Sequence, residues 1–268
     1  MRTWRLVWVP FLLCACFSLP LVSQNTPAMN AEGVSLLRRA AAQLVGGVTL
    51  NDITLSGTAR RIAGSDDESG TVVLKATVSG AMRLDFSYPS GTWSEVRTAA
   101  ADGPSGAWIG RDGAAHAIAF HNLVNDGGLV PAVTIGRLLS SANTLVTFMG
   151  QETRDGQSVL HLKAAERFQA KRANTAQLLE HLSEMDIFLD SSTLLPTAID
   201  FNTHPDNDAG VDVQVEIRFS DYRAVSGAQI PFRVQKYLNN GLILDLKFES
   251  AVVNSGIAAN TFQVGAGQ

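Results

Sequence analysis

The sequence predicts a mainly β protein (α+β) in which an antiparallel sheet has one apolar and one polar face and carries a few short helices. The clearest evidence lies in residues 211–220, where Val, Ile and Phe alternate with charged or polar residues. A period of two is expected for a strand with one buried face. Other strand-like segments are separated by turn sequences roughly every ten residues, which is typical of an antiparallel sheet, sandwich or barrel.

The closing third, residues 186–264, has the pattern of an antiparallel meander. A turn at Asn239, Asn240 and Gly241 follows the strand that contains Phe232, and Asn-Gly supplies the positive backbone angles of a tight hairpin turn. Apolar residues then continue at every second position: Leu242, Leu244, Leu246 and Phe248. A sheet of this kind must pack on something apolar or wrap around it.

The first 23 residues have the anatomy of a secretory signal peptide. Arg2 and Arg5 precede an apolar run that is broken by prolines and closed by small and polar residues. We therefore expect cleavage after Ser23 and a periplasmic, exported chain. The alternative is that "LCAC" is a lipobox, so that the protein is anchored to the membrane through a lipidated Cys16. Both cysteines lie in this segment, so a chain cut after Ser23 has no disulfide and is held by its core.

The remaining elements follow in order. Residues 24–33 are polar and are expected to form a flexible leader, and 34–47 an amphipathic helix that ends at two glycines. Strands begin near residue 51. Residues 121–141 break the strand pattern with an apolar loop and a short helix, which is either a plug or a mobile lid. A further helix is expected at 169–185, and no linker divides 34–265, which we interpret as one domain.

Composition argues against several classes of function. The net charge of −4 and the absence of a Lys/Arg excess argue against nucleic-acid binding. The five histidines form no metal-ligand pair, and the acidic loop at 206–208 lacks the spacing and final Glu of a calcium loop. No nucleophile elbow or phosphate-binding glycine loop is present. The sequence therefore predicts no enzyme, no metal and no cofactor.

Apolar side chains are what remain as candidates for a site. Either they form a packed core, or some of them line a cavity that holds an apolar ligand. Binding such a ligand needs no catalytic residue, because a C16 acyl chain offers on the order of 10 kcal/mol before ordering costs. The candidate lining residues are Phe86, Trp93, Trp108, Phe120, Leu138, Leu139, Phe148, Phe219, Phe232, Leu244 and Phe248.

Several phrases occur along residues 34–264 in a distinctive order: "GTVVLKATVSGAMRLDFSYPSG", "DGPSGAWIGRDG", "FMGQETRDGQSVLHLKA", "DIFLDSSTLLPTAIDF", "IRFSDYRAVSGAQIPFRVQKY" and "VVNSGIAANTFQV". In this order and spacing they resemble the periplasmic lipoprotein-carrier (LolA/LolB-like) superfamily. The resemblance implies a half-open, incomplete antiparallel β-barrel, with short helices covering its concave side and an apolar cavity between. It also implies an arginine that helps to close the lid, and Arg60 and Arg61 are the nearest positions. The helix at 169–185 is additional to the carrier pattern.

Two hypotheses follow. The first is a monomeric periplasmic carrier or sensor that holds acyl chains of a lipid or lipoprotein in a contiguous apolar cavity with few charges. The alternative is a non-catalytic interaction or regulatory domain with a filled barrel, which contacts an envelope protein through its surface.

Overall fold

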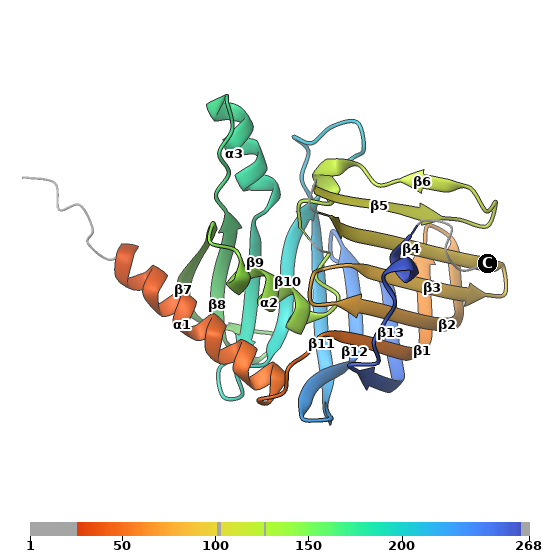
Figure 1. Cartoon of the computed structure of the whole chain (residues 1–268), viewed down its shortest axis with the longest axis horizontal. Coiled ribbons are helices and arrows are strands. Elements are labelled where there is room, and N and C mark those ends of the chain that lie inside the picture. The colour runs from red at the N-terminus through yellow and green to blue at the C-terminus, as the bar shows by residue number, and fades with distance from the viewer. Residues whose placement is uncertain (1–25, 101–102, 126, 264–268) are drawn as a thin grey trace, which may run out of the picture.

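A single antiparallel sheet dominates the computed structural model, which describes residues 26–100, 103–125 and 127–263 (Figure 1). The predicted signal peptide and Cys16 lie outside the described residues. The thirteen strands lie in the order β6-β5-β4-β3-β2-β1-β13-β12-β11-β10-β9-β8-β7. Their bounds are β1 Asp52–Ala63, β2 Asp66–Thr77, β3 Met82–Tyr88, β4 Gly91–Ala100, β5 Gly103–Ile109, β6 Ala115–Ala117, β7 Thr144–Arg154, β8 Gln157–Glu166, β9 Met185–Asp190, β10 Pro196–Thr203, β11 Val213–Val225, β12 Ala228–Leu238 and β13 Gly241–Val253.

The sheet consists of two meanders joined at their middle. Strands β1–β6 and β7–β13 each run in sequence order, and β1 pairs with β13, with Ile53 opposite Val253. Strands β6 and β7 remain as edges, so the sheet curves without closing. The predicted half-open antiparallel barrel is thereby confirmed.

The sheet bends where β1 pairs with β13. The register shifts between Ser56 and Gly57, and a Cβ on Gly57 would lie 2.1 Å from the carbonyl oxygen of Lys247. Only glycine fits so close an approach, and a bulge of this kind bends the strand that carries it.

The hairpin forms where the sequence predicts, but its positive φ angles belong to Asn239 and Asn240 and not to the predicted Asn-Gly pair, because Gly241 already begins β13. Both residues have positive φ, +46° and +65°, as tight hairpin turns require. A second register shift follows, so that Leu244 pairs with Lys236 while Leu242 pairs with Tyr237. The alternation predicted through Leu242 is therefore broken, because the bulge leaves one residue of β13 unpaired.

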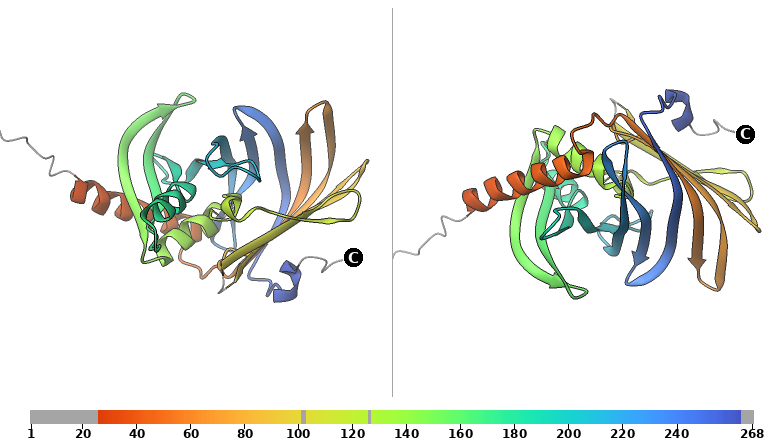
Figure 2. Two further views of the ribbon diagram at one scale, coloured as in Figure 1. Left: turned by 90° about the horizontal axis from the view of Figure 1, so that it is seen from above. Right: turned by 90° about the horizontal axis from the view of Figure 1, so that it is seen from below.

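Helix α1 (Thr26–Val45) lies on the concave side against β7, β12 and α2 (Pro131–Ser140), as Figure 2 shows. It buries the apolar face that the sequence predicts: Leu36, Leu37, Ala40 and Leu44. Its start corrects the expected leader at 24–33, because residues 26–33 are already helical. Gly33 lets the helix approach β7 so closely that a Cβ would lie 2.9 Å from the Phe148 nitrogen. Asn30 also accepts a hydrogen bond from the Thr147 hydroxyl at 2.8 Å.

The segment predicted to interrupt the strands, 121–141, contains α2 and overlaps the short helix η1 (Phe120–Asn122), which begins one residue before it. Pro131 begins α2, where its fixed backbone angle suits the first turn. Val133, Ile135 and Leu138 are buried in the main core together with Leu37 and Leu44 of α1. This helix therefore fills the concave side beneath α1 in the manner of a plug.

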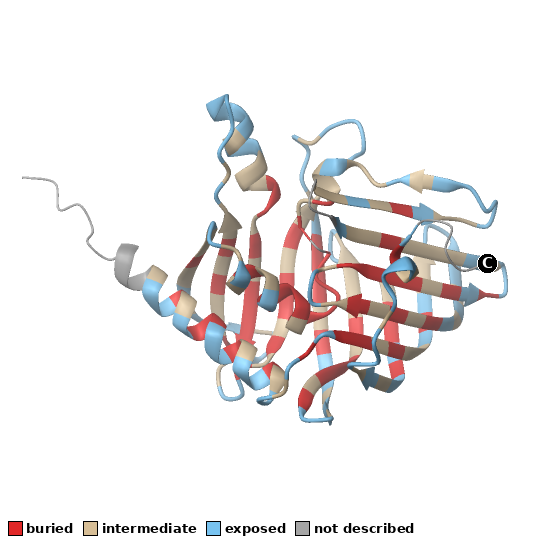
Figure 3. Ribbon diagram, in the orientation of Figure 1, coloured by how far each residue is buried: buried red, intermediate tan, exposed pale blue. Residues whose placement is uncertain are grey.

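Helix α3 (Ala173–Leu182) is shorter than predicted and stands at one end of the sheet, where five of its ten residues are exposed (Figure 3). The final short helix is η2 (Ala259–Phe262). Within the described ranges, no helix combines the length and apolar character needed to cross a membrane.

Candidate ligand-binding pocket

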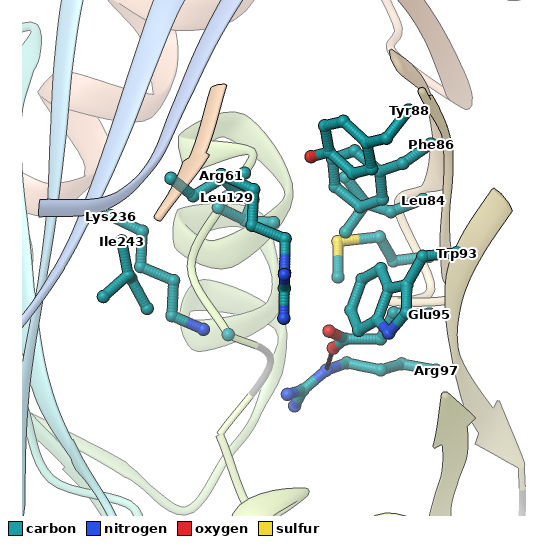
Figure 4. A pocket seen from close by; sticks show the side chains of 13 residues that line it. Arg61, Leu84, Phe86, Tyr88, Trp93, Glu95, Arg97, Leu129, Lys236 and Ile243 are labelled. Atoms are coloured by element: carbon teal, nitrogen blue, oxygen red, sulfur yellow. Dashed lines mark hydrogen bonds and ion pairs between the residues drawn. The ribbon is translucent and has the colours of Figure 1, made fainter. Parts of the chain in front are cut away.

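A cavity of about 130 Å³ lies between two walls of the sheet (Figure 4). One wall is formed by β3 and β4, the other by β12 and β13, and residues 127–129 before α2 close it from the side. Its lining is Arg61, Met82, Leu84, Phe86, Tyr88, Trp93, Glu95, Arg97, Gly127, Leu129, Lys236, Ile243 and Leu244.

The apolar wall comes from one face of β3 and the start of β4. Every second residue of β3 faces the cavity, because successive side chains of a strand point to opposite faces. Phe86 stacks on Tyr88 with ring centroids 5.6 Å apart, and it contacts Trp93 at 5.3 Å. Phe86 and Trp93 are also direct partners across the β3–β4 pair. The wall thus combines three neighbouring aromatic rings with the aliphatic side chains of Met82 and Leu84.

Charged side chains stand beside this wall. Glu95 accepts a 2.7 Å hydrogen bond from Nε of Arg97, whose Nη1 also donates to the Asn122 carbonyl at 3.0 Å. Burial opposes ionisation of Glu95, but the positive charges of Arg97 and Lys236 outweigh it and lower the pKa of this carboxyl. Loss of water around the Lys236 ammonium lowers its pKa. The expected cavity with few charges is therefore not what the structure presents.

A second hollow, about 470 Å³, continues from the first. The two share Arg61, Tyr88 and Trp93. At its far side Trp108 stacks on His116 with ring centroids 4.0 Å apart. Ligand pockets commonly enclose about 300–1,000 Å³, so the two hollows together reach that range.

The predicted lining residues divide into three groups. Phe86, Trp93 and Leu244 line the pocket, and Trp108 lines the neighbouring hollow. Phe120 is 57% exposed and lines neither. The others pack in the main core or against it: Leu138, Leu139, Phe148, Phe219, Phe232 and Phe248.

Most of the lining was not predicted from the sequence, although the alternation of apolar and polar residues contained a signal for it. Tyr88 continues the inward positions of β3, and Lys236 continues those of β12 after Phe232. Glu95 and Arg97 have the same parity in β4 as Trp93. No pattern along the chain pointed to Leu129, which reaches the pocket from the loop before α2.

The two arginines expected near the lid point to opposite faces of β1. Arg60 faces away from the pocket and donates a 2.8 Å hydrogen bond to Asp67, whereas Arg61 enters the pocket. A lid-closing role for either stays a prediction. Helix α2 instead touches the β2–β3 turn through Arg137, whose Cδ would lie 2.7 Å from a Cβ on Gly80.

The remaining polar groups suggest structural roles. In the part of the chain that the structure describes, no three His, Cys, Asp or Glu residues gather as metal ligands. His181 contacts Asp212 at 2.9 Å, and Nδ1 of His204 lies 3.0 Å from the Val211 carbonyl oxygen. These histidines tie α3 and the 204–212 loop together.

No family model matches the chain, and no curated protein matches it by sequence. Solved structures do match. A domain named as an outer membrane lipoprotein-sorting protein, from Vibrio parahaemolyticus, has a TM-score of 0.59 and 11% identity, and the match covers 88% of this chain and 98% of that one.

Two further structures agree. A DUF1329 family protein from Desulfovibrio piger has a TM-score of 0.61 and 11% identity, with 90% of this chain and 99% of that one covered. A LolA superfamily protein from Nitrosomonas europaea has a TM-score of 0.55 and 10% identity, with 86% and 97% covered. At such identities the likeness concerns the fold, and the fold of this chain is that of the LolA-like proteins.

Proposed function

We propose that this protein is an exported carrier or sensor that binds an acyl chain of a lipid or lipoprotein in the pocket between β3–β4 and β13. The observation that supports this most is the aromatic and aliphatic wall facing a hollow on the concave side. A LolA superfamily protein and a domain named for lipoprotein sorting have the same fold, which adds support.

The pocket volume indicates how much of a chain it holds. A cavity of about 150 Å³ in another protein binds benzene, so the inner hollow of about 130 Å³ suits roughly six carbons. Burying six methylenes contributes about 5 kcal/mol before the chain is ordered. The rest of the chain would then lie in the larger hollow, against Trp93 and Trp108.

Export to the periplasm is proposed from residues 1–23, with anchoring through Cys16 as the alternative. The mass of the purified protein distinguishes the two, because a lipidated Cys16 adds acyl groups and leaves residues 17–23 in place. Binding an acyl chain requires no catalytic step, and we propose that the protein is not an enzyme.

The alternative function is contact with an envelope protein by a domain without a ligand. One observation favours it: the half of the concave side beneath α1 and α2 is filled by Leu37, Leu44 and Ile135, each fully buried. A protein of this kind would be empty when isolated.

Native mass spectrometry of the full chain, purified from a bacterial envelope, tests the proposal. We expect a bound species of acyl-lipid mass. The variant Leu244→Trp should lose it, because the indole would fill the pocket. Val252→Trp is the matched control, since Val252 lies on the same strand and is 52% exposed. A protein that is empty and takes up no fluorescent fatty acid would favour the alternative.

A further inference from the structure

The described residues that line the pocket carry more positive than negative charge. Among the described residues, Glu95 is the single acidic residue in the lining, and its carboxylate is paired with Arg97 at 2.7 Å. Arg61 and Lys236 reach the same space from β1 and β12 and add two further positive charges (Figure 4).

Lys236 has no close counter-charge in the part of the chain that the structure describes. Among the described residues, it forms no ion pair within 4.0 Å and no side-chain hydrogen bond, and Glu95 acts on it only through longer-range attraction. The pKa of Lys236 is lowered because burial removes water from the ammonium. A partly buried cation without a partner is unfavourable, and an anion placed beside it would relieve that cost.

Arg61 is also weakly paired. In the described part of the chain, its one ion pair is to Oε1 of Glu68 at 4.0 Å, and Arg111 holds the same oxygen at 2.9 Å. Glu68 accepts a hydrogen bond from Ser90 as well. The guanidinium of Arg61, drawn between the two walls in Figure 4, therefore keeps donors available to a ligand.

A third group in the pocket is unsatisfied. Tyr88 is 7% exposed, and its hydroxyl is buried without a hydrogen-bond partner among the described residues. Burial raises the pKa of Tyr88 to about 12. The hydroxyl is therefore protonated at neutral pH and can donate a hydrogen bond. A buried hydroxyl without a partner costs about 1–3 kcal/mol, and a ligand atom that accepts a hydrogen bond from it would remove that cost.

We propose that the pocket selects acyl amphiphiles with an anionic headgroup, a carboxylate or a phosphate, which Arg61, Lys236 and the Tyr88 hydroxyl bind. This inference rests on the proposed function and names the chemical class of its ligand. The acyl chain would lie on Leu84, Phe86 and the rest of the β3 wall. The anion would accept hydrogen bonds from the three donors, and charge-assisted hydrogen bonds of this kind are the strong ones.

Competition binding with the full chain tests this, using decanoate, decyl phosphate, decanol and inorganic phosphate to displace a fluorescent acyl probe. At pH 7.5 we expect at least one of the two anionic amphiphiles to bind about tenfold or more tightly than decanol, which corresponds to about 1.4 kcal/mol. Inorganic phosphate alone should not displace the probe. In Arg61→Met and in Lys236→Met, the ratio of the affinity for the anionic amphiphile to the affinity for decanol should fall to near one. Arg60→Met is the matched control, because Arg60 faces away from the pocket, and it should leave the ratio unchanged.

Each other result has a distinct meaning. Equal binding of decanol and both anionic compounds by the unaltered protein would overturn the anion preference and leave the proposed function standing. If neither the acyl compounds nor the fluorescent probe bind to the protein, the proposed function itself would be overturned. Displacement by inorganic phosphate as strong as by decyl phosphate would show an anion site that does not use the chain. The wild-type ratio decides the proposal even if one variant fails to fold.

Discussion

Asp200 lies in a group of charged side chains on the convex face of the sheet. Arg154 donates from one nitrogen to Asp200 at 2.8 Å and to Glu216 at 2.6 Å, while Nε of Arg218 donates to Glu216 at 2.7 Å. The Arg154 guanidinium also stacks over the Phe188 ring, 4.0 Å from its centroid. Two carboxylates thus share one arginine nitrogen in a partly buried setting.

The two carboxyls respond differently to these surroundings. Burial raises the pKa of Asp200 to about 6, with the nearby charges of Glu216 and Asp186 adding to it, and Arg154 offsets only part of the increase. Burial also acts on Glu216, but the hydrogen bonds from Arg218 and Arg154 outweigh it and lower its pKa.

Stability should therefore depend on pH through Asp200. Because its folded pKa is raised, the folded state holds this proton more tightly, and that stabilisation is present below pH 4 and lost as the pH rises through 6. The free energy of unfolding of the wild type should fall by about 2–3 kcal/mol relative to Asp200→Asn between pH 4 and pH 7.5. Urea unfolding of both proteins at several pH values measures it. A difference that stays constant across this range would contradict the assignment.

Helices α1 and α2 each contain a glycine whose surroundings differ. A Cβ on Gly33 of α1 would meet backbone atoms of β7 at 2.9 Å, whereas Gly136 of α2 is exposed and would meet nothing within 4 Å. Backbone atoms cannot move aside as a flexible side chain can. The same substitution should therefore have opposite effects in the two helices.

Gly33→Ala should lower the free energy of unfolding by about 1–3 kcal/mol, because α1 must move away from β7. Gly136→Ala should raise it by about 0.5–1 kcal/mol through helix propensity alone. Chemical denaturation of the wild type and of both variants measures these two changes in the free energy of unfolding. If Gly33→Ala stabilised the protein, α1 would not lie as close to β7 as the structure has it.

The same glycine explains why one element was mispredicted. Gly33 and the polar residues before it have the composition of a leader, and the reason for a glycine there is the approach of β7, which is more than a hundred residues distant along the chain. The position of the hairpin between β12 and β13 was predicted correctly, because its turn residues are local in the sequence. The bulge that displaces Leu242 was not, because register is set between strands.

Across the whole molecule, the concave side has a filled half and a hollow half. Helices α1 and α2 occupy the space within β7–β12, and the pocket lies between β3–β4 and β12–β13. The sequence predicted a curved sheet with apolar side chains inside it. It could not show which of them would meet a helix and which would face a hollow, since Phe148 and Phe86 have similar strand patterns and differ in what packs opposite them.

Fluorescence quenching by a bromine-labelled fatty acid tests the central claim most directly, because bromine quenches only a tryptophan that it approaches closely. Trp93 lines both hollows. If the acyl chain occupies the pocket, the label should quench the protein, the quenching should persist in Trp108→Phe and fall in Trp93→Phe, and unlabelled fatty acid should reverse it. Binding with quenching that Trp93→Phe leaves unchanged would place the chain elsewhere, and no binding at all would contradict the proposed function.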